Sequence, residues 1–179
     1  WARKDLQILL NKLIIEGRTA QRFDPNQPIT RAEFAEFIVR GLGLEGDADA
    51  AKVFRDLGTS SNKAAYIGAA YKANIVAGVS EGRFEPNSLI TREQMASMMV
   101  RAARAAGVEI LLSRNQSDYL VSYGDYNALS AWARGDMARA VEAKIISGIS
   151  GNRLGPQNNA TRAEAAVMIK RLLEYVKLM

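Results

Sequence analysis

One segment of this chain occurs three times, and that repetition constrains the fold more than any other feature of the sequence. The copies occupy residues 23–33, 84–94 and 154–164. Thr30, Thr91 and Thr161 mark the same position in each copy, at offsets of 61 and then 70 residues. Nearby prolines and glycines follow the same two offsets. Self-similarity of this kind indicates three copies of one supersecondary unit.

The residues that flank the repeated segment define the extent of each copy. We predict repeats at residues 1–44, 53–107 and 122–179, separated by linkers at 45–52 and 108–121. An aromatic-x-Asp opening, Phe54-Arg-Asp and Tyr123-Gly-Asp, begins the second and third copies but not the first. Because the chain also starts at Trp1, inside a repeat, we expect the first copy to be N-terminally truncated and the chain to be a mature or excised fragment.

Each copy is predicted to form a helix, a loop and a second helix. Apolar residues recur at helical spacing before a glycine in every copy, which predicts a left-handed residue at the end of the first helix. These glycines are Gly17, Gly78 and Gly148. The second helix begins with Thr30-x-x-Glu33 or its counterpart, which is typical of a capping box. In that motif the threonine hydroxyl and the Glu or Gln side chain bond to otherwise free backbone amides.

The apolar stripes of the second helices predict how the copies pack. Bulky residues such as Phe34 in one copy align with small residues such as Ala165 in another. Helices that meet around a shared axis need such complementary sizes. We therefore expect an all-α fold of three helix-loop-helix repeats, arranged as a pseudo-threefold spindle around a central three-helix bundle. A linear solenoid is the alternative, and the dissimilar stripes favour it less.

Composition excludes several classes of function. The chain of 179 residues contains neither histidine nor cysteine, which rules out His-based triads and metal sites built on thiolates or imidazoles. It has no apolar run long enough to span a membrane. The net charge of +5 favours an anionic partner, but no basic face with interleaved aromatics indicates nucleic-acid binding. Every repeated Glu is assigned to a cap, so we expect a binding module with no catalytic residues, metal or cofactor, rather than a glycosidase.

One repeated residue has no evident role in this architecture. Arg31, Arg92 and Arg162 stand at the first helical position, where a positive charge opposes the helix dipole at a cost of about 0.3–1 kcal/mol. Three repetitions of an unfavourable choice indicate a function. A guanidinium beside free helix amides suits a carboxylate or a phosphate. We therefore predict an anion-binding site at each of these helix starts.

Tryptophan and aspartate residues add candidates for recognition of a sugar. Trp1 and Trp132 align with each other, and the second copy has Asn62 at that position. An indole offers an apolar face to a sugar ring, although packing is an equally good interpretation. Asp56 and Asp125 are candidate acceptors for sugar hydroxyls, with helix capping as the favoured alternative.

Together these elements resemble the S-layer homology domain, in a tandem of three. The family pattern comprises an aromatic-x-Asp opening, a Trp-Ala helix start, a Gly-Ile-Ile-x-Gly-like turn, Phe-x-Pro-Asn and Ile-Thr-Arg-Ala-Glu. In this chain the pattern reads Phe54-Arg-Asp, Trp132-Ala, Ile14-Ile-Glu-Gly17, Phe84-Glu-Pro-Asn and Ile29-Thr-Arg-Ala-Glu. The resemblance covers nearly the whole chain apart from the linkers.

The resemblance implies non-covalent anchoring of a secreted S-layer or surface protein to the cell wall of a Gram-positive bacterium. The implied ligand is the secondary cell wall polymer, with a terminal pyruvylated N-acetylmannosamine held in grooves between repeats. The implied contacts to the pyruvate carboxylate are Arg31, Arg92 and Arg162. The implied groove lining comprises the turn glycines Gly17, Gly78 and Gly148 and the hydroxyl residues Thr19, Ser80 and Ser150. We expect a monomeric module, without membrane insertion, in a protein able to form an S-layer lattice.

Departures from the pattern predict that the three grooves are not equivalent. Glu93 places an extra carboxylate beside Arg92, and we expect it to weaken the hold on an anion there. Leu154-Gly155 replaces the usual aromatic-Asp pair, which predicts a different loop in the third copy. We expect one or two grooves to dominate binding. A structural or oligomerising module with a protein partner is the alternative function.

Overall fold

The computed structural model describes residues 1–19, 21–58 and 62–179. Within these residues the chain is helical, and its only extended pairings are isolated bridges, so the predicted all-α class is confirmed. The α-helices are α1 (Arg3–Asn11), α2 (Arg31–Leu42), α3 (Ala64–Lys72), α4 (Arg92–Ala105), α5 (Gln116–Leu120), α6 (Arg134–Glu142) and α7 (Arg162–Tyr175). Short 3-10 helices are η1 (Ala50–Val53), η2 (Tyr126–Ala128) and η3 (Ala131–Ala133). None of the helices in the described part is long and apolar enough to cross a membrane.

The second helix of each repeat begins where the sequence predicts. Helices α2, α4 and α7 start directly after Thr30, Thr91 and Thr161. Each threonine hydroxyl accepts a hydrogen bond from the amide three residues later, and the Glu or Gln at that position accepts one from the threonine amide. All three capping boxes are therefore confirmed, and each stabilises its helix by roughly 0.5–2 kcal/mol.

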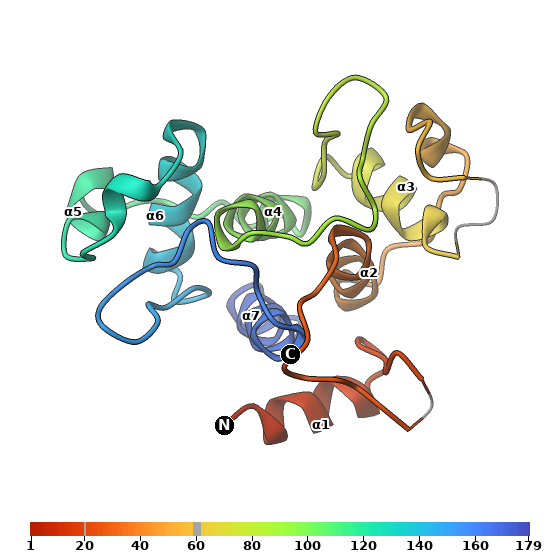
Figure 1. Cartoon of the computed structure of the whole chain (residues 1–179), viewed down its shortest axis with the longest axis horizontal. Coiled ribbons are helices and arrows are strands. Elements are labelled where there is room, and N and C mark those ends of the chain that lie inside the picture. Colours follow the sequence, from red (N-terminus) through yellow and green to blue (C-terminus); the bar gives the residue numbers. More distant parts are fainter. Residues whose placement is uncertain (20, 59–61) are drawn as a thin grey trace.

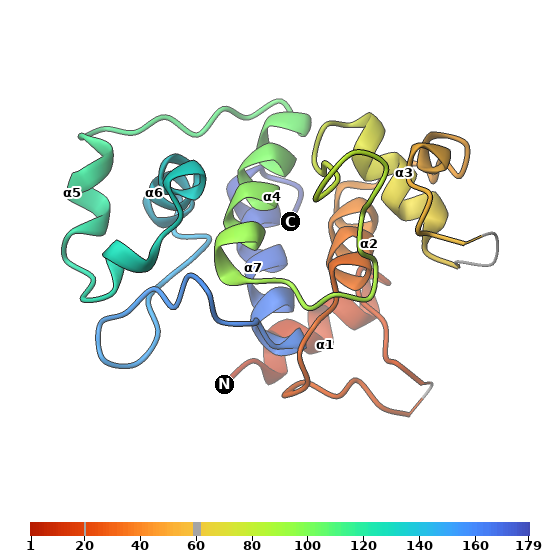
Figure 2. The same cartoon turned by 45° about the horizontal axis from the view of Figure 1, so that its top comes forward.

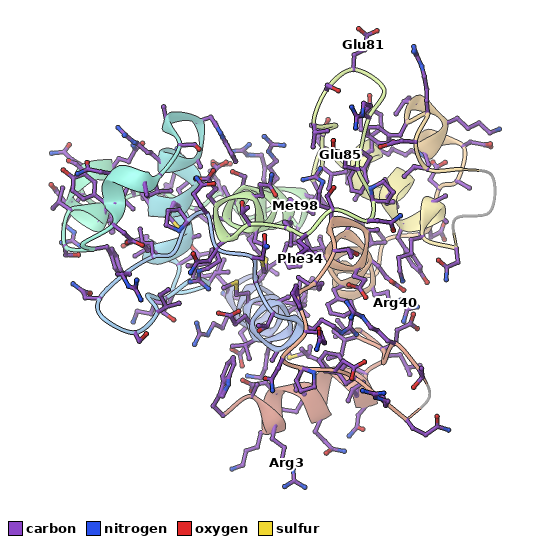
Figure 3. The ribbon with its side chains drawn as sticks, viewed as in Figure 1. Arg3, Phe34, Arg40, Glu81, Glu85 and Met98 are labelled. Atoms are coloured by element: carbon purple, nitrogen blue, oxygen red, sulfur yellow. The ribbon has the colours of Figure 1, made fainter. Side chains whose placement is uncertain are left out.

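These three capped helices pack around one centre (Figure 1). Every pair of them is in contact, and Phe34 lies fully buried between them (Figure 3). A ring of backbone hydrogen bonds joins the loops just before the caps. The Ile29 amide donates to the Ala160 carbonyl (3.0 Å), the Ala160 amide to the Ile90 carbonyl (3.2 Å) and the Ile90 amide to the Ile29 carbonyl (3.2 Å). A linear solenoid would separate the first and third copies, whereas here they bond directly.

The first helices lie outside this centre, and each packs on the second helix of another repeat. Helix α1 packs against α7, α3 against α2, and α6 against α4, so the repeats interlock (Figure 2). The longer insert before the third copy contributes α5, which packs on α6. This arrangement brings the start of each second helix against the loop of the next copy.

The turn glycines are needed for a reason that the sequence did not reveal. Left-handed residues do end the first helices, but they are Leu13, Asn74 and Lys144, four positions before the predicted glycines. At Gly17 an added Cβ would lie 2.4 Å from the Thr19 carbonyl oxygen. Gly78 and Gly148 are similarly crowded. These glycines therefore permit close approach of the chain, and the predicted left-handed conformation was wrong.

At Gly155 the third copy keeps the backbone conformation of the other two, whereas the turn before it differs because Ile149, rather than Ser150, bridges to Arg153. Gly155 has a φ of 59°, which matches 59° at Glu85 and 55° at Asp24. Because glycine adopts this left-handed conformation without strain, the Leu154-Gly155 substitution preserves the backbone. The expectation of a different loop is therefore wrong at this position.

Candidate functional site

The three repeated arginines lie buried at the junctions between repeats. Arg31, Arg92 and Arg162 are 7%, 3% and 2% exposed. Each Nε donates to a loop carbonyl of the next repeat, at 2.9 Å from Arg31 to Phe84, 2.7 Å from Arg92 to Leu154 and 2.8 Å from Arg162 to Phe23. The Nη2 atoms also donate to carbonyls on the glycine turns, of Ala77, Ser147 and Glu16.

These contacts correct two sequence-based interpretations. The architecture does need the arginine, because its guanidinium joins one repeat to the next. The helix-start amides are also occupied, since the Arg31 amide donates to the Ser88 carbonyl (2.9 Å) and the Ala32 amide to the Pro86 carbonyl (3.1 Å). The same pairing recurs at the starts of α4 and α7. An anion therefore cannot use those amides, and only atoms that the junction leaves open are available to it.

The junctions differ at the third guanidinium nitrogen, Nη1. In Arg162 this atom donates to the Glu33 carboxylate at 2.8 Å. In Arg92 it lies 3.4 Å from the Glu164 carboxylate. Glu33 and Glu164 are the acidic capping-box residues of the neighbouring repeats. Gln94 holds the corresponding place beside Arg31, whose Nη1 forms no hydrogen bond or ion pair with the residues that the structure describes.

A groove opens at this uncompensated arginine. The Arg31 groove, as we call it, has a volume of about 350 Å³ and is lined by Arg31, Gly78, Gln94, Ser97, Arg101 and Trp132, among others. Its described lining contains two arginines and no carboxylate. Ser97 is only 5% exposed, and its Oγ has no hydrogen-bond partner among the described residues. The groove thus combines uncompensated positive charge with an unpaired hydroxyl.

The corresponding Arg92 groove is smaller, and a carboxylate of the protein itself lies in it. Its volume is about 150 Å³, and its lining includes Trp1, Arg92, Gly148, Glu164 and Arg171. The Glu164 carboxylate partly neutralises Arg92 there. In contrast to the Arg31 groove, this site holds one of the protein's own carboxylates beside its buried arginine.

At the third junction one carboxylate pairs with two arginines. Glu33 accepts from Arg162 and also from Arg18, at 3.1 Å from Nε. Burial raises the pKa of Glu33, but the bonds from Arg18 and the Thr30 amide and the charge of Arg162 lower it to below its ordinary value. Glu36, one turn later, pairs with Arg40 and Lys63. Two carboxylates, Glu33 and Glu36, therefore lie among the cations of this junction, whereas the described lining of the Arg31 groove contains none.

Burial lowers the pKa of each of the three repeated arginines. At Arg31 the carboxylates of Glu85 and Asp56 act in the opposite sense. A guanidinium nevertheless stays protonated in proteins. Arg31 is therefore a cation in a place where its charge has no direct carboxylate partner.

The predicted tryptophans are exposed rather than buried. Trp132 is 59% exposed and lines the Arg31 groove, and Trp1 is 86% exposed and lines the Arg92 groove. Packing therefore does not account for them. Each presents a surface beside an arginine-lined groove, as a sugar platform requires.

The remaining predicted residues divide between the grooves and the loops. Gly78 lines the Arg31 groove and Gly148 the Arg92 groove. Thr19, Ser80 and Ser150 are exposed residues in the narrow turns beyond the glycines, where Thr19 and Ser80 bridge to Arg22 and Arg83. The structure does not bring these hydroxyls into the described linings of the Arg31 and Arg92 grooves, which name Gly78 and Gly148 but none of the three.

The aspartates hold the loops that the arginines contact. Asp56 accepts from the amides of Phe84 (2.9 Å) and Glu85 (2.7 Å). Asp125 accepts from the amides of Leu154 (2.7 Å) and Gly155 (2.8 Å). Both carboxylates therefore fix a loop carbonyl in the position where an arginine Nε bonds to it, which is a positioning role.

Glu93 does not act on Arg92 in the predicted way. Its carboxylate accepts from the Ser130 amide (3.0 Å) and hydroxyl (2.7 Å), at the start of the third repeat. It is 3% exposed and serves to dock that segment. The carboxylate that pairs with Arg92 is Glu164 instead.

Sequence reasoning missed three residues of the Arg31 groove. Arg101 aligns with Arg40 and Arg171 at the repeat offsets, a signal as regular as that of the predicted arginines. Ser97 aligns with Glu36 and Val167, so nothing repetitive identifies it. Gln94 was visible as the neutral member of the capping set, but its effect depends on a neighbour that only the folded chain brings close.

Comparisons with known proteins identify the three repeats. The model of the S-layer homology domain matches residues 1–35, 53–96 and 122–166. Similar relatives include an amylopullulanase of Thermoanaerobacterium thermosulfurigenes, 35% identical over 97% of this chain and 9% of its own length. An exoglucanase XynX of Acetivibrio thermocellus is 36% identical over 97% of the chain and 16% of its own. An S-layer protein sap of Bacillus anthracis is 30% identical over 96% and 20%. The chain thus spans about a tenth to a fifth of these relatives, which differ widely in the activities that their names describe.

Proposed function

This chain belongs to the S-layer homology domain family, and from that premise we propose that it anchors the protein carrying it to a bacterial cell wall. Domains of this family serve S-layer proteins and surface enzymes as wall-anchoring modules. The proposed ligand is an anionic wall glycan whose terminal sugar bears a carboxylate, such as the pyruvyl group of pyruvylated N-acetylmannosamine. The proposed setting is outside a Gram-positive cell, with the module itself monomeric.

The Arg31 groove carries this proposal. The Nη1 atom of Arg31 has no acceptor among the described residues, and Arg101 adds a second cation to the lining of the groove. A carboxylate bonded to a guanidinium gains roughly 1.5–3 kcal/mol per charge-assisted contact where water is excluded. Trp132 offers an indole face at the same groove, against which a sugar ring can stack.

Arg101 permits a test that leaves the repeat junction intact. Unlike Arg31, it makes no hydrogen bond or ion pair with the described residues, so Arg101→Gln should not disturb the fold. We expect this variant to bind purified wall polymer about tenfold more weakly in calorimetric titration, as expected for one lost charge-assisted contact. The matched control is Arg104→Gln, on the same helix but paired with Glu109 at the surface, which should bind like the unaltered chain.

Chemical removal of pyruvate from the polymer supplies the complementary arm. The unaltered chain should lose most of its affinity for the treated polymer. Equal binding to treated and untreated polymer would reject the carboxylate as the recognised group. Failure to bind either one, together with self-association in ultracentrifugation, would instead support the oligomerising alternative.

A further inference from the structure

We propose that Gln94 determines which groove accepts the anion, because at the other two junctions a glutamate of the protein already occupies the anion's place. This inference rests on the proposed function and specifies its site. It makes the Arg31 groove the single binding site of the chain. The Arg92–Glu164 and Arg162–Glu33 pairs then act as permanent connections between repeats.

The geometry of the Arg92–Glu164 and Arg162–Glu33 junctions, which we call the closed junctions, supports this assignment. Both pairs join the arginine Nη1 to the capping-box carboxylate of the adjacent repeat, at 2.8 Å for Arg162 and 3.4 Å for Arg92. This is the nitrogen that Arg31 leaves without an acceptor in the described part of the chain. An internal glutamate and an external carboxylate present the same oxygen pair to a guanidinium. A ligand at either closed junction must therefore displace a tethered competitor.

Gln94 changes the charge of the groove without losing the cap. Its side-chain Oε1 accepts a hydrogen bond from the Thr91 backbone amide at 3.2 Å, and its backbone amide donates to the Thr91 hydroxyl at 3.4 Å. Glu33 and Glu164 make the same two bonds in their own boxes. Helix capping thus tolerates either residue, and the choice between them affects mainly the guanidinium next to it.

Ser97 is a second, independent sign that this groove receives a ligand. Its Oγ is buried and lacks a hydrogen-bond partner in the described residues, and the side chain lines the groove beside Gln94 and Arg101. Buried hydroxyls in folded proteins are normally paired. A sugar hydroxyl or carboxylate entering the groove would supply the missing partner. The equivalent positions carry Glu36 and Val167, neither of which is an unpaired hydroxyl.

The decisive variant is Gln94→Glu, which makes the first junction resemble the other two. We expect it to fold with the normal helical spectrum, because Glu caps α2 and α7. Its affinity for a synthetic pyruvylated disaccharide should fall at least tenfold in calorimetric titration. Ser97→Ala, which keeps the groove's charge, should lower the affinity by a smaller factor of several-fold.

Stoichiometry tests the closed junctions. The unaltered chain should bind one disaccharide per molecule, and Glu164→Gln should add a second site by releasing Arg92. Full affinity in Gln94→Glu, or two or three sites in the unaltered chain, would overturn the inference while leaving wall binding intact. An unchanged stoichiometry in Glu164→Gln would overturn it as well. Absence of any binding by the unaltered chain would instead reject the proposed function itself.

Discussion

Replacing Arg162 with alanine tests whether the buried arginines hold the repeats together. This side chain is 2% exposed and donates to three acceptors: the Phe23 carbonyl at 2.8 Å, the Glu16 carbonyl at 2.7 Å and the Glu33 carboxylate at 2.8 Å. Breaking a buried ion pair by removal of one partner typically costs 3–5 kcal/mol. Glu33 keeps its bond from Arg18, so we expect the low end, about 3 kcal/mol.

Thermal unfolding measures this loss directly. For a chain of this length a change of 1 kcal/mol moves Tm by about 2–4 °C, so Arg162→Ala should lower Tm by about 6–12 °C. The control is Arg22→Ala, whose exposed side chain pairs with Asp24 at the surface and should shift Tm by no more than a few degrees. A Tm for Arg162→Ala within 2 °C of the unaltered chain would contradict the reasoning. It would mean that the third junction contributes nothing to closure.

Two further predictions concern the turns and the response to acid. Gly78→Ala places a Cβ 2.6 Å from the Ser80 carbonyl oxygen and should destabilise the fold by about 1–3 kcal/mol in urea titration, whereas Gly124→Ala, with open space around it, should be within about 0.5 kcal/mol of the unaltered chain. The pKa of Glu33 is lowered in the folded chain, so its contribution to stability is complete above the unfolded pKa and is lost as pH falls through the folded value. Glu33→Gln should therefore lower the free energy of unfolding near neutral pH and flatten its decline in acid, and an unchanged acid dependence would show that Glu33 is not the responsible group.

The local features of this fold follow from short stretches of sequence. Thr30 and Glu33 form a capping box because both partners lie within one turn of the same helix, so spacing alone predicts the bonds. The repeat offsets add the all-α class by showing that one helical unit occurs three times. These predictions needed no knowledge of which segments meet in space.

The site was predicted only in part, since its chemistry depends on contacts between repeats. The sequence predicts that Arg31, beside a helix dipole, has no partner within the protein, but the carbonyl of Phe84, 53 residues away, accepts a hydrogen bond from its Nε. The helix-start amides, which the sequence predicts to be free, donate to carbonyls in the loop after Glu85. No short sequence pattern predicts those acceptors, because they lie in another repeat. Gly78 was likewise placed correctly in the turn but for the wrong reason, because the atoms that crowd it belong to Ser80, Arg83 and Phe54.

A closed ring of three similar repeats explains how one residue type can serve both structure and recognition. Closure requires every junction to hold, and each buried arginine meets that requirement through its Nε and Nη2 bonds to carbonyls. The third nitrogen, Nη1, is not needed for those contacts, so it can donate either to a carboxylate of the protein or to that of a ligand. A change from Glu to Gln at the adjacent cap then converts a structural junction into a binding junction without altering the backbone around it. Three copies allow that division because two internally paired junctions, at Arg92 and Arg162, can stabilise the ring that presents Arg31.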